Sequence, residues 1–168
     1  MGLAHSPRIV TDGLVLCVDA ASKRSYPGTG TTWTDLKGGN NGTLINGPTF
    51  DSDNGGSIVF DGSDDRVDCT SPSEIDSISE ITMIAWVRYS GIGVTSGSVV
   101  KFYKNSDLVY TSGSITTNTG TGSTLVLGNR PGGGRNFSGR MGVAMVYNRV
   151  LSADEILQNY LSTKERYA

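Results

Sequence analysis

Apolar and polar positions alternate along most of the chain in short runs, which is typical of β-strands rather than helices. The clearest run begins at residues 58–60, Ile-Val-Phe, which favour a strand, and the turn pair Asp61-Gly62 follows it directly. Residues 66–69 then alternate polar and apolar, as a half-buried strand does. We therefore expect strand, tight turn and strand here, with residues 81–88 as the partner strand.

Two longer patterns lie near the ends of the chain. Residues 9–19 are apolar on both faces over much of their length, which indicates a strand in the middle of a sheet. Residues 137–147 are expected to form the last strand, in which every second side chain lies on one face. That face is predicted to carry Met141, Val143, Met145 and Tyr147. Shorter strands are expected at residues 31–36, 42–45, 49–50 and 124–128, and a hairpin at residues 98–103 and 108–110.

The pattern changes from alternating to helical near the C-terminus. Ser152 and Glu155 have the spacing of a capping box, in which each residue satisfies a backbone N–H at the start of a helix. Apolar residues follow at helical spacing, and this predicts one short C-terminal helix. Its apolar positions are Ile156, Leu157, Tyr160 and Leu161.

Composition agrees with an all-β domain. The chain has 168 residues, enough to bury one core, and its 23 glycines indicate many turns. Only 18% of the residues are charged, which is ordinary for two packed sheets. We predict an N-terminal arm at residues 1–8, a β-sandwich at residues 9–149, and a C-terminal helix and tail at residues 150–168.

The net charge and the lack of long apolar runs restrict the possible binding partners. The net charge of −2 gives no basic surface for nucleic acid or anionic membranes, and no run approaches the ~20 apolar residues of a membrane span. We therefore expect neither nucleic acid nor a membrane as a partner.

Cys17 and Cys69 lie on separate predicted strands, so the possibility of a disulfide between them stays open. Two buried thiols are favoured, because the N-terminus has no apolar export signal.

Six stretches at both ends of the chain carry a recognisable combination of residues: 11–20, 25–36, 41–44, 55–67, 84–87 and 146–156. In combination they resemble the laminin-G-like domains of the concanavalin A-like lectin/glucanase superfamily, which occur in many bacterial and phage proteins. The amino-acid sequence of these stretches is most similar to that of marine bacteriophage virion proteins that carry such a domain. This resemblance implies an antiparallel two-sheet jelly-roll sandwich.

The chain departs from that family pattern in its middle. Such domains usually have several strands between the one at residues 85–87 and the lysine–aromatic strand at residues 101–103, whereas only a short connection lies there in this chain. One sheet is therefore expected to be shortened. We hypothesise that a neighbouring subunit or a capsid surface covers the edge left open, because proteins rarely leave strand edges unpaired.

The resemblance implies a non-enzymatic structural protein of a phage particle, in the role of capsid decoration, head fibre or tail-associated protein. It would be assembled in the host cytoplasm and would lie on the virion surface, with other virion proteins or copies of itself as partners. The alternative is a glycan-binding adhesion module that contacts a cell-surface glycan. A glycoside hydrolase is the third and least favoured hypothesis.

The carboxylates between Glu74 and Glu80 argue against that third hypothesis. They resemble the Glu-x-Asp motifs of sandwich glycosidases, but the spacing is one residue too long. On a regular strand the two glutamates would lie roughly 20 Å apart, whereas a retaining pair needs about 5–5.5 Å. The single histidine, His5, lies in the predicted arm, so no catalytic triad is expected. We predict no enzymatic activity.

An acidic cluster is the candidate metal site. Asp61, Asp64 and Asp65 lie close together at the predicted turn, with Asp68 on the strand that follows. Carboxylate oxygens suit calcium, and the resemblance implies a family in which calcium often binds at the sandwich rim. The alternative is that Asp61 caps the turn and Asp68 faces solvent.

Sugar binding would need an exposed aromatic ring beside polar groups. The candidates are Tyr26, Trp33, Tyr89 and Tyr103. One or two of them are expected in the core. A core position is favoured for Trp33, because apolar residues are nearby in the sequence.

Overall fold

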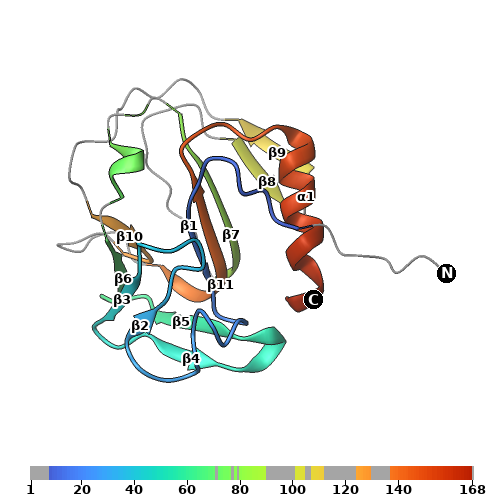
Figure 1. The fold of residues 1–168 in the computed structure, drawn as a ribbon. Helices are drawn as coiled ribbons and strands as arrows, with labels where there is room; N and C mark the ends of the chain where they lie inside the picture. The colour runs from blue at the N-terminus through green and yellow to red at the C-terminus, as the bar shows by residue number, and fades with distance from the viewer. Residues whose placement is uncertain are drawn as a thin grey trace.

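Two antiparallel sheets face each other, and a C-terminal helix covers the outer face of the larger sheet (Figure 1). The computed structural model describes residues 8–70, 72–76, 78, 80–89, 101–104, 107–111, 124–129 and 137–167. At Tyr89 and at residues 101–104 and 107–111 only the backbone is described. The predicted all-β fold with one C-terminal helix is confirmed.

The larger sheet is built around its longest strand, β11. β11 pairs with β7 along one edge, and with β1 and β5 along the other, while β4 extends the sheet beyond β5. The strands are β1 (Leu14–Asp19), β4 (Thr49–Asp51), β5 (Ser57–Asp61), β7 (Thr82–Tyr89) and β11 (Ser138–Tyr147).

The smaller sheet has the order β10-β6-β3-β2, and a separate hairpin pairs β8 with β9. This confirms the hairpin that was predicted in the middle of the chain. The smaller sheet contains β2 (Thr32–Trp33), β3 (Gly42–Ile45), β6 (Arg66–Cys69) and β10 (Leu125–Leu127), and the hairpin contains β8 (Lys101–Lys104) and β9 (Asp107–Thr111).

The predicted strand, turn and strand around Asp61-Gly62 form, but the two strands belong to different sheets. β5 lies in the larger sheet and β6 in the smaller one, so the turn at residues 62–65 carries the chain across the sandwich. The expected partner, residues 81–88, also forms a strand, yet β7 pairs with β11 and with neither β5 nor β6. That pairing prediction is wrong, because alternation places a strand's faces and leaves its neighbours undetermined.

β1 is buried on both faces as predicted, but it is not a middle strand, because it pairs only with β11 among the described residues. Its other edge is covered by the loop that follows β2, at residues 34–41. Asp35 Oδ1 accepts a hydrogen bond from Cys17 N at 2.9 Å, and Asn40 Nδ2 donates one to Val15 O at 3.1 Å. Side chains thus satisfy backbone groups that a neighbouring strand would otherwise pair.

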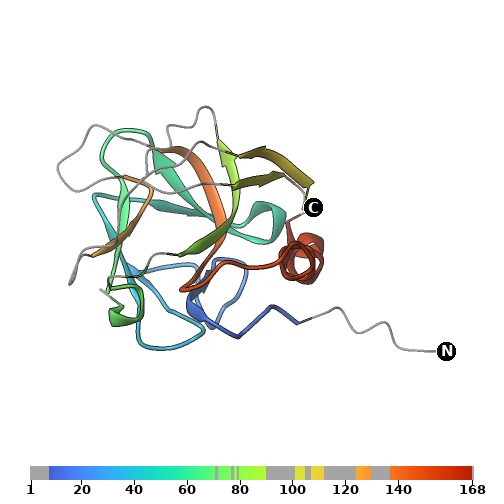
Figure 2. The ribbon, with the colours of Figure 1, turned by 90° about the horizontal axis from the view of Figure 1, so that it is seen from above.

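The core lies between the sheets, and a second apolar layer lies between the larger sheet and α1 (Ala153–Thr163). Figure 2 shows α1 end-on, on the side of the larger sheet away from the smaller one. Val143, Met145 and Tyr147 share one face as predicted, and that face lies toward α1, but Met141 lies in the core between the sheets. The register of β11 against β7 shifts between Met141 and Val143, so the simple alternation fails at this bulge.

The capping box of α1 is confirmed, since Ser152 accepts from Glu155 N and Glu155 accepts from Ser152 N. Its buried face differs from the predicted one. Asn159 and Thr163 are almost fully buried, whereas Leu157 is 40% exposed. The apolar pattern misses these residues because hydrogen bonds make their burial favourable.

Cys17 and Cys69 are both buried free thiols, as favoured by the sequence. They lie in different layers, Cys69 between the sheets and Cys17 beneath α1. Burial raises the pKa of each thiol to about 12, so both remain protonated and unreactive at neutral pH.

Candidate functional site

The candidate metal site is built on the turn that crosses from β5 to β6. Gly62 has a φ of 82°, a left-handed conformation that strains other residues, and a β-carbon there would stand 2.7 Å from Ser138 Cβ. Only glycine fits both conditions. The turn therefore stays tight, and the acidic residues that flank Gly62 are held together at the rim of the sandwich.

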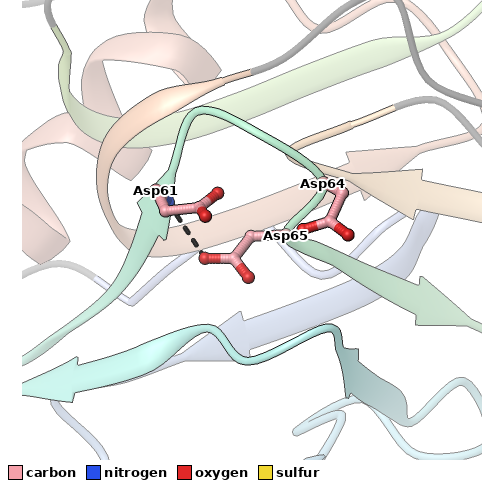
Figure 3. Close-up of side chains that lie close together, drawn as sticks. All are labelled: Asp61, Asp64 and Asp65. Carbon is pink, nitrogen blue, oxygen red and sulfur yellow. Dashed lines mark hydrogen bonds between the residues drawn. The ribbon is translucent and has the colours of Figure 1, made fainter.

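The three predicted aspartates meet at this turn, as Figure 3 shows. One carboxylate oxygen from each of Asp61, Asp64 and Asp65 lies within 4.8 Å of the other two. Asp61 and Asp64 are exposed, whereas Asp65 is 5% exposed. Asp65 Oδ2 accepts a hydrogen bond from Asp61 N at 2.9 Å, and Asp61 Oδ1 accepts one from Ser63 N at 2.7 Å.

The two ends of the cluster differ electrostatically. The Ser63 N–H and other backbone donors stabilise the Asp61 carboxylate and lower its pKa. Burial raises the pKa of Asp65, and the nearby charges of Asp61 and Asp64 raise it further. A bound cation would offset the cost of burying the Asp65 charge and the repulsion between the carboxylates, because it favours the charged form of all three groups.

Asn129 completes the surroundings of the turn. It follows β10, is 7% exposed, and donates from Nδ2 to Ser63 O at 3.2 Å. Its Oδ1 atom is buried and accepts no hydrogen bond in the described part of the chain. Calcium takes six to eight oxygen ligands at about 2.3–2.6 Å, so ligands on opposite sides lie about 5 Å apart. The spacing of the aspartate oxygens fits that requirement, and the calcium site stays a prediction.

Asp68 is separate from this cluster. It lies on β6, where its two carboxylate oxygens accept hydrogen bonds from Arg66 Nε at 2.9 Å and Arg66 Nη2 at 3.2 Å. An acidic side chain already neutralised by an arginine has little charge left to attract a cation. The alternative that Asp68 simply faces solvent is also incomplete, since both partners are half-buried.

The aromatic candidates for sugar binding divide into two groups. Trp33 is 0% exposed and Tyr26 is 3% exposed, and both lie in the core between the sheets. Neither ring is available as an exposed platform. The core role favoured for Trp33 is confirmed, whereas the prediction of Tyr26 as a sugar-binding ring is wrong. Tyr89 and Tyr103 lie on β7 and β8, and their side chains fall outside the described residues.

The acidic residues between Glu74 and Glu80 do not share a strand. Glu74 lies in a 3₁₀ turn at Ser73–Ile75, and Glu80 precedes β7 as an exposed residue. The geometry of a glycosidase strand is therefore absent at these positions. His5 lies outside the described residues.

A pocket on the outer face of the larger sheet, the face that α1 covers, was not predicted. It has a volume of about 240 Å³ and lies beside the end of α1, where Trp86 and Arg88 of β7 meet Arg140 of β11 and Tyr167. The sequence pattern predicts Trp86 and Arg88 on a strand and assigns them no site. Their convergence with Arg140 depends on the β7–β11 register, which the sequence pattern did not give.

No helix in the described part of the chain is both long enough and apolar enough to span a bilayer.

Residues 25–157 match the family model described as the concanavalin A-like lectin/glucanases superfamily. No curated protein matches the sequence.

Two solved structures of Trypanosoma rangeli sialidase are similar in fold, one in complex with the inhibitor DANA and the other with 2,3-difluoro-KDN. Both give a TM-score of 0.52, with 12% and 15% sequence identity. The matches cover 98% and 93% of this chain but only 36% and 33% of the sialidase chains. This chain thus spans about a third of their length, and at such identities the likeness shows the fold alone.

Proposed function

Because this chain belongs to the concanavalin A-like lectin/glucanase superfamily, we propose that it is a non-enzymatic structural module of a bacteriophage particle. In this role it lies on the virion surface, as capsid decoration, head fibre or tail-associated protein, and contacts other virion proteins or copies of itself. The phage assignment is supported by the resemblance of the sequence to phage virion proteins that carry such a domain.

The physical observation that carries a contact role is an open apolar stripe on β7. Met83, Ala85 and Val87 pair with β11 residues that lie in the core between the sheets, so the stripe faces the same side. Met83 is nevertheless 63% exposed and Val87 39% exposed. In the described part of the chain the smaller sheet does not reach far enough to cover them.

An uncovered inner face supports the hypothesis that a neighbour closes the sandwich. Apolar surface of this kind marks protein contacts when it is contiguous. The unpaired edge of β7 within the described residues adds backbone N–H and C=O groups that a partner strand can pair. We propose that the stripe, Met83-Ala85-Val87 with the β7 edge, is the surface that docks on the particle.

Particles purified from the producing host test the role directly. We expect peptide mass spectrometry to find the chain in the particles at a fixed ratio to the major capsid protein, and antibody labelling to place it on their surface. A variant with Met83→Ser and Val87→Thr is expected to fold and to lose incorporation. Val150→Thr, which alters an exposed apolar residue elsewhere, is the matched control. Absence of the chain from intact particles would overturn the proposal.

Glycan binding is the second candidate function, and one specific observation favours it. The pocket beside α1 combines aromatic rings with charged and polar side chains, which is the usual composition of a small-ligand site. Incubation with a panel of polysaccharides separates both candidates from a hydrolase, since a binding module releases no reducing ends.

A further inference from the structure

The pocket on the outer face of the larger sheet is formed by four segments that are far apart in the sequence. β7 and β11 supply its floor, the turn before β5 supplies one side, and the C-terminal residues after α1 supply the other. Its lining includes Asp53, Ser57, Trp86, Arg88, Arg140 and Tyr167. At about 240 Å³ it is smaller than the ~300–1,000 Å³ of pockets for drug-sized ligands. It therefore suits a single ring.

Two arginines lie side by side on the pocket floor. Arg88 of β7 is the direct cross-strand partner of Arg140 of β11, and like charges in that position destabilise a sheet. Asp51 forms an ion pair with Arg140 and offsets its charge. Arg88 is exposed and forms no ion pair with any described residue. The pocket thus presents a guanidinium whose geometry fits a carboxylate with two parallel hydrogen bonds.

The apolar wall of the pocket is fixed in place. Trp86 Nε1 donates to Thr163 Oγ1 at 2.8 Å, and the indole ring stacks on Tyr160 at 5.5 Å and on Tyr167 at 5.8 Å between centroids. The Tyr167 hydroxyl in turn donates to Asp19. A wall held by these contacts loses little freedom when a ligand binds, which favours affinity.

Asp53 restricts which anion the pocket accepts. Its exposed side chain lines the same space and forms no ion pair with either arginine among the described residues. A bare carboxylate would gain from Arg88 but would be repelled by Asp53. A ligand that carries hydroxyl groups besides its carboxylate avoids this conflict, because a hydroxyl donates to Asp53 while the carboxylate accepts from Arg88.

We propose that this pocket binds a sugar residue bearing a carboxylate. Arg88 holds the carboxylate, Asp53 and Ser57 accept hydrogen bonds from ring hydroxyls, and the edges of Trp86 and Tyr167 contact the carbon face. The inference gives the second candidate function a location and a ligand class, and it is independent of whether the chain lies on a virion.

The two tryptophans of the chain allow a direct test by ¹⁵N NMR. The indole N–H of Trp86 reports on the pocket, and that of fully buried Trp33 is an internal control. Glucuronate, glucose and acetate are titrated separately into the full chain. We expect glucuronate to shift the Trp86 signal in a saturable manner and to leave the Trp33 signal in place. Glucose and acetate should each bind at least about tenfold more weakly.

Two variants assign the roles. Arg88→Met is expected to weaken glucuronate binding about tenfold or more, since a charged hydrogen bond is lost. Arg24→Met removes another exposed arginine and should change nothing. Asp53→Ala should weaken glucuronate and strengthen acetate, because repulsion is removed together with the hydroxyl acceptor. The proposal is overturned if acetate binds as well as glucuronate, if Arg88→Met retains full affinity, or if the Trp86 signal does not respond.

Discussion

The ring of Tyr167 lies directly over Gly142, where β11 carries no side chain. A β-carbon at position 142 would overlap Cε1 of the ring, and the bulge in β11 occurs at the same position. Gly142 thus leaves the space in which the C-terminal residues return to the sheet. There Tyr167 and Arg166 both bind the buried carboxylate of Asp19.

Gly142→Ala is therefore expected to destabilise the fold by about 1–3 kcal/mol, since overpacking forces Tyr167 off the sheet. Urea unfolding measures the change. Tyr167→Ala is the companion variant. The loss of unfolding free energy in the double variant should be smaller than the sum of the two single losses, because the overlap no longer exists. Full additivity would mean that the ring and the glycine do not share this space.

Asp35 replaces a neighbouring strand along the edge of β1, and its loss should be costly. Its buried carboxylate accepts from Cys17 N at 2.9 Å, Lys37 N at 3.0 Å and Asn40 N at 3.2 Å. Asp35→Ala is expected to lower the free energy of unfolding by about 2–4 kcal/mol, because buried donors lose their acceptor. Asp35→Asn keeps one acceptor oxygen and should lose less. An equal loss for both variants would contradict this account.

Asn159 links α1 to the N-terminal segment through a closed set of buried hydrogen bonds. Its Oδ1 accepts from Val10 N at 2.8 Å and its Nδ2 donates to Tyr147 Oη at 3.0 Å, while Tyr147 Oη donates to Val10 O at 3.0 Å. Asn159→Leu is expected to cost about 2–3 kcal/mol in urea unfolding despite the similar size. Ser162→Ala, on the same helix, should cost much less. A neutral Asn159→Leu would mean that the network adds nothing beyond packing.

These residues show what the sequence does and does not predict. Local signals were reliable: the turn at Asp61-Gly62 and the capping box at Ser152 both form, because each depends on a few neighbouring residues. Contacts over long distances were not predicted. The strand alternation did not reveal that β7 pairs with β11, and this pairing brings Arg88 beside Arg140.

Polar residues in buried positions were missed for a related reason. Asn159 follows the apolar positions of α1 and looks like a solvent-facing residue until Tyr147 and Val10 are placed beside it. The acidic turn is the opposite case. Its three aspartates are so close in sequence that a tight turn alone brings them together, and the sequence therefore sufficed to group them.

The pH dependence of stability should report on Glu155. Hydrogen bonds from Arg149 and from the Ser152 backbone lower its pKa from 4.5 to about 2. Because the folded pKa is the lower one, the unfolded chain takes up the proton first as the pH falls. The stabilising contribution is full above pH 4.5 and is lost toward pH 2.

Urea unfolding of the wild type and of Glu155→Gln, compared from neutral pH downward, measures this contribution. The gap between the two proteins should narrow below pH 4.5 and close near pH 2. Glu165→Gln, at an exposed position in the 3₁₀ turn after α1, should leave a small gap at all pH values. A gap for Glu155→Gln that does not change with pH would show that only the neutral capping contacts matter.

The turn between β5 and β6 is expected to bind calcium through its aspartates. The carboxylates of Asp61, Asp64 and Asp65 converge, whereas Asp68 on the adjoining strand is paired with Arg66. Isothermal titration should therefore show calcium binding that Asp64→Asn weakens about tenfold or more and Asp68→Asn leaves unchanged. Because protonation of Asp65 competes with the cation and its pKa is raised, affinity should fall as the solution is acidified. Equal heats from the wild type and Asp64→Asn would exclude this cluster as the binding site.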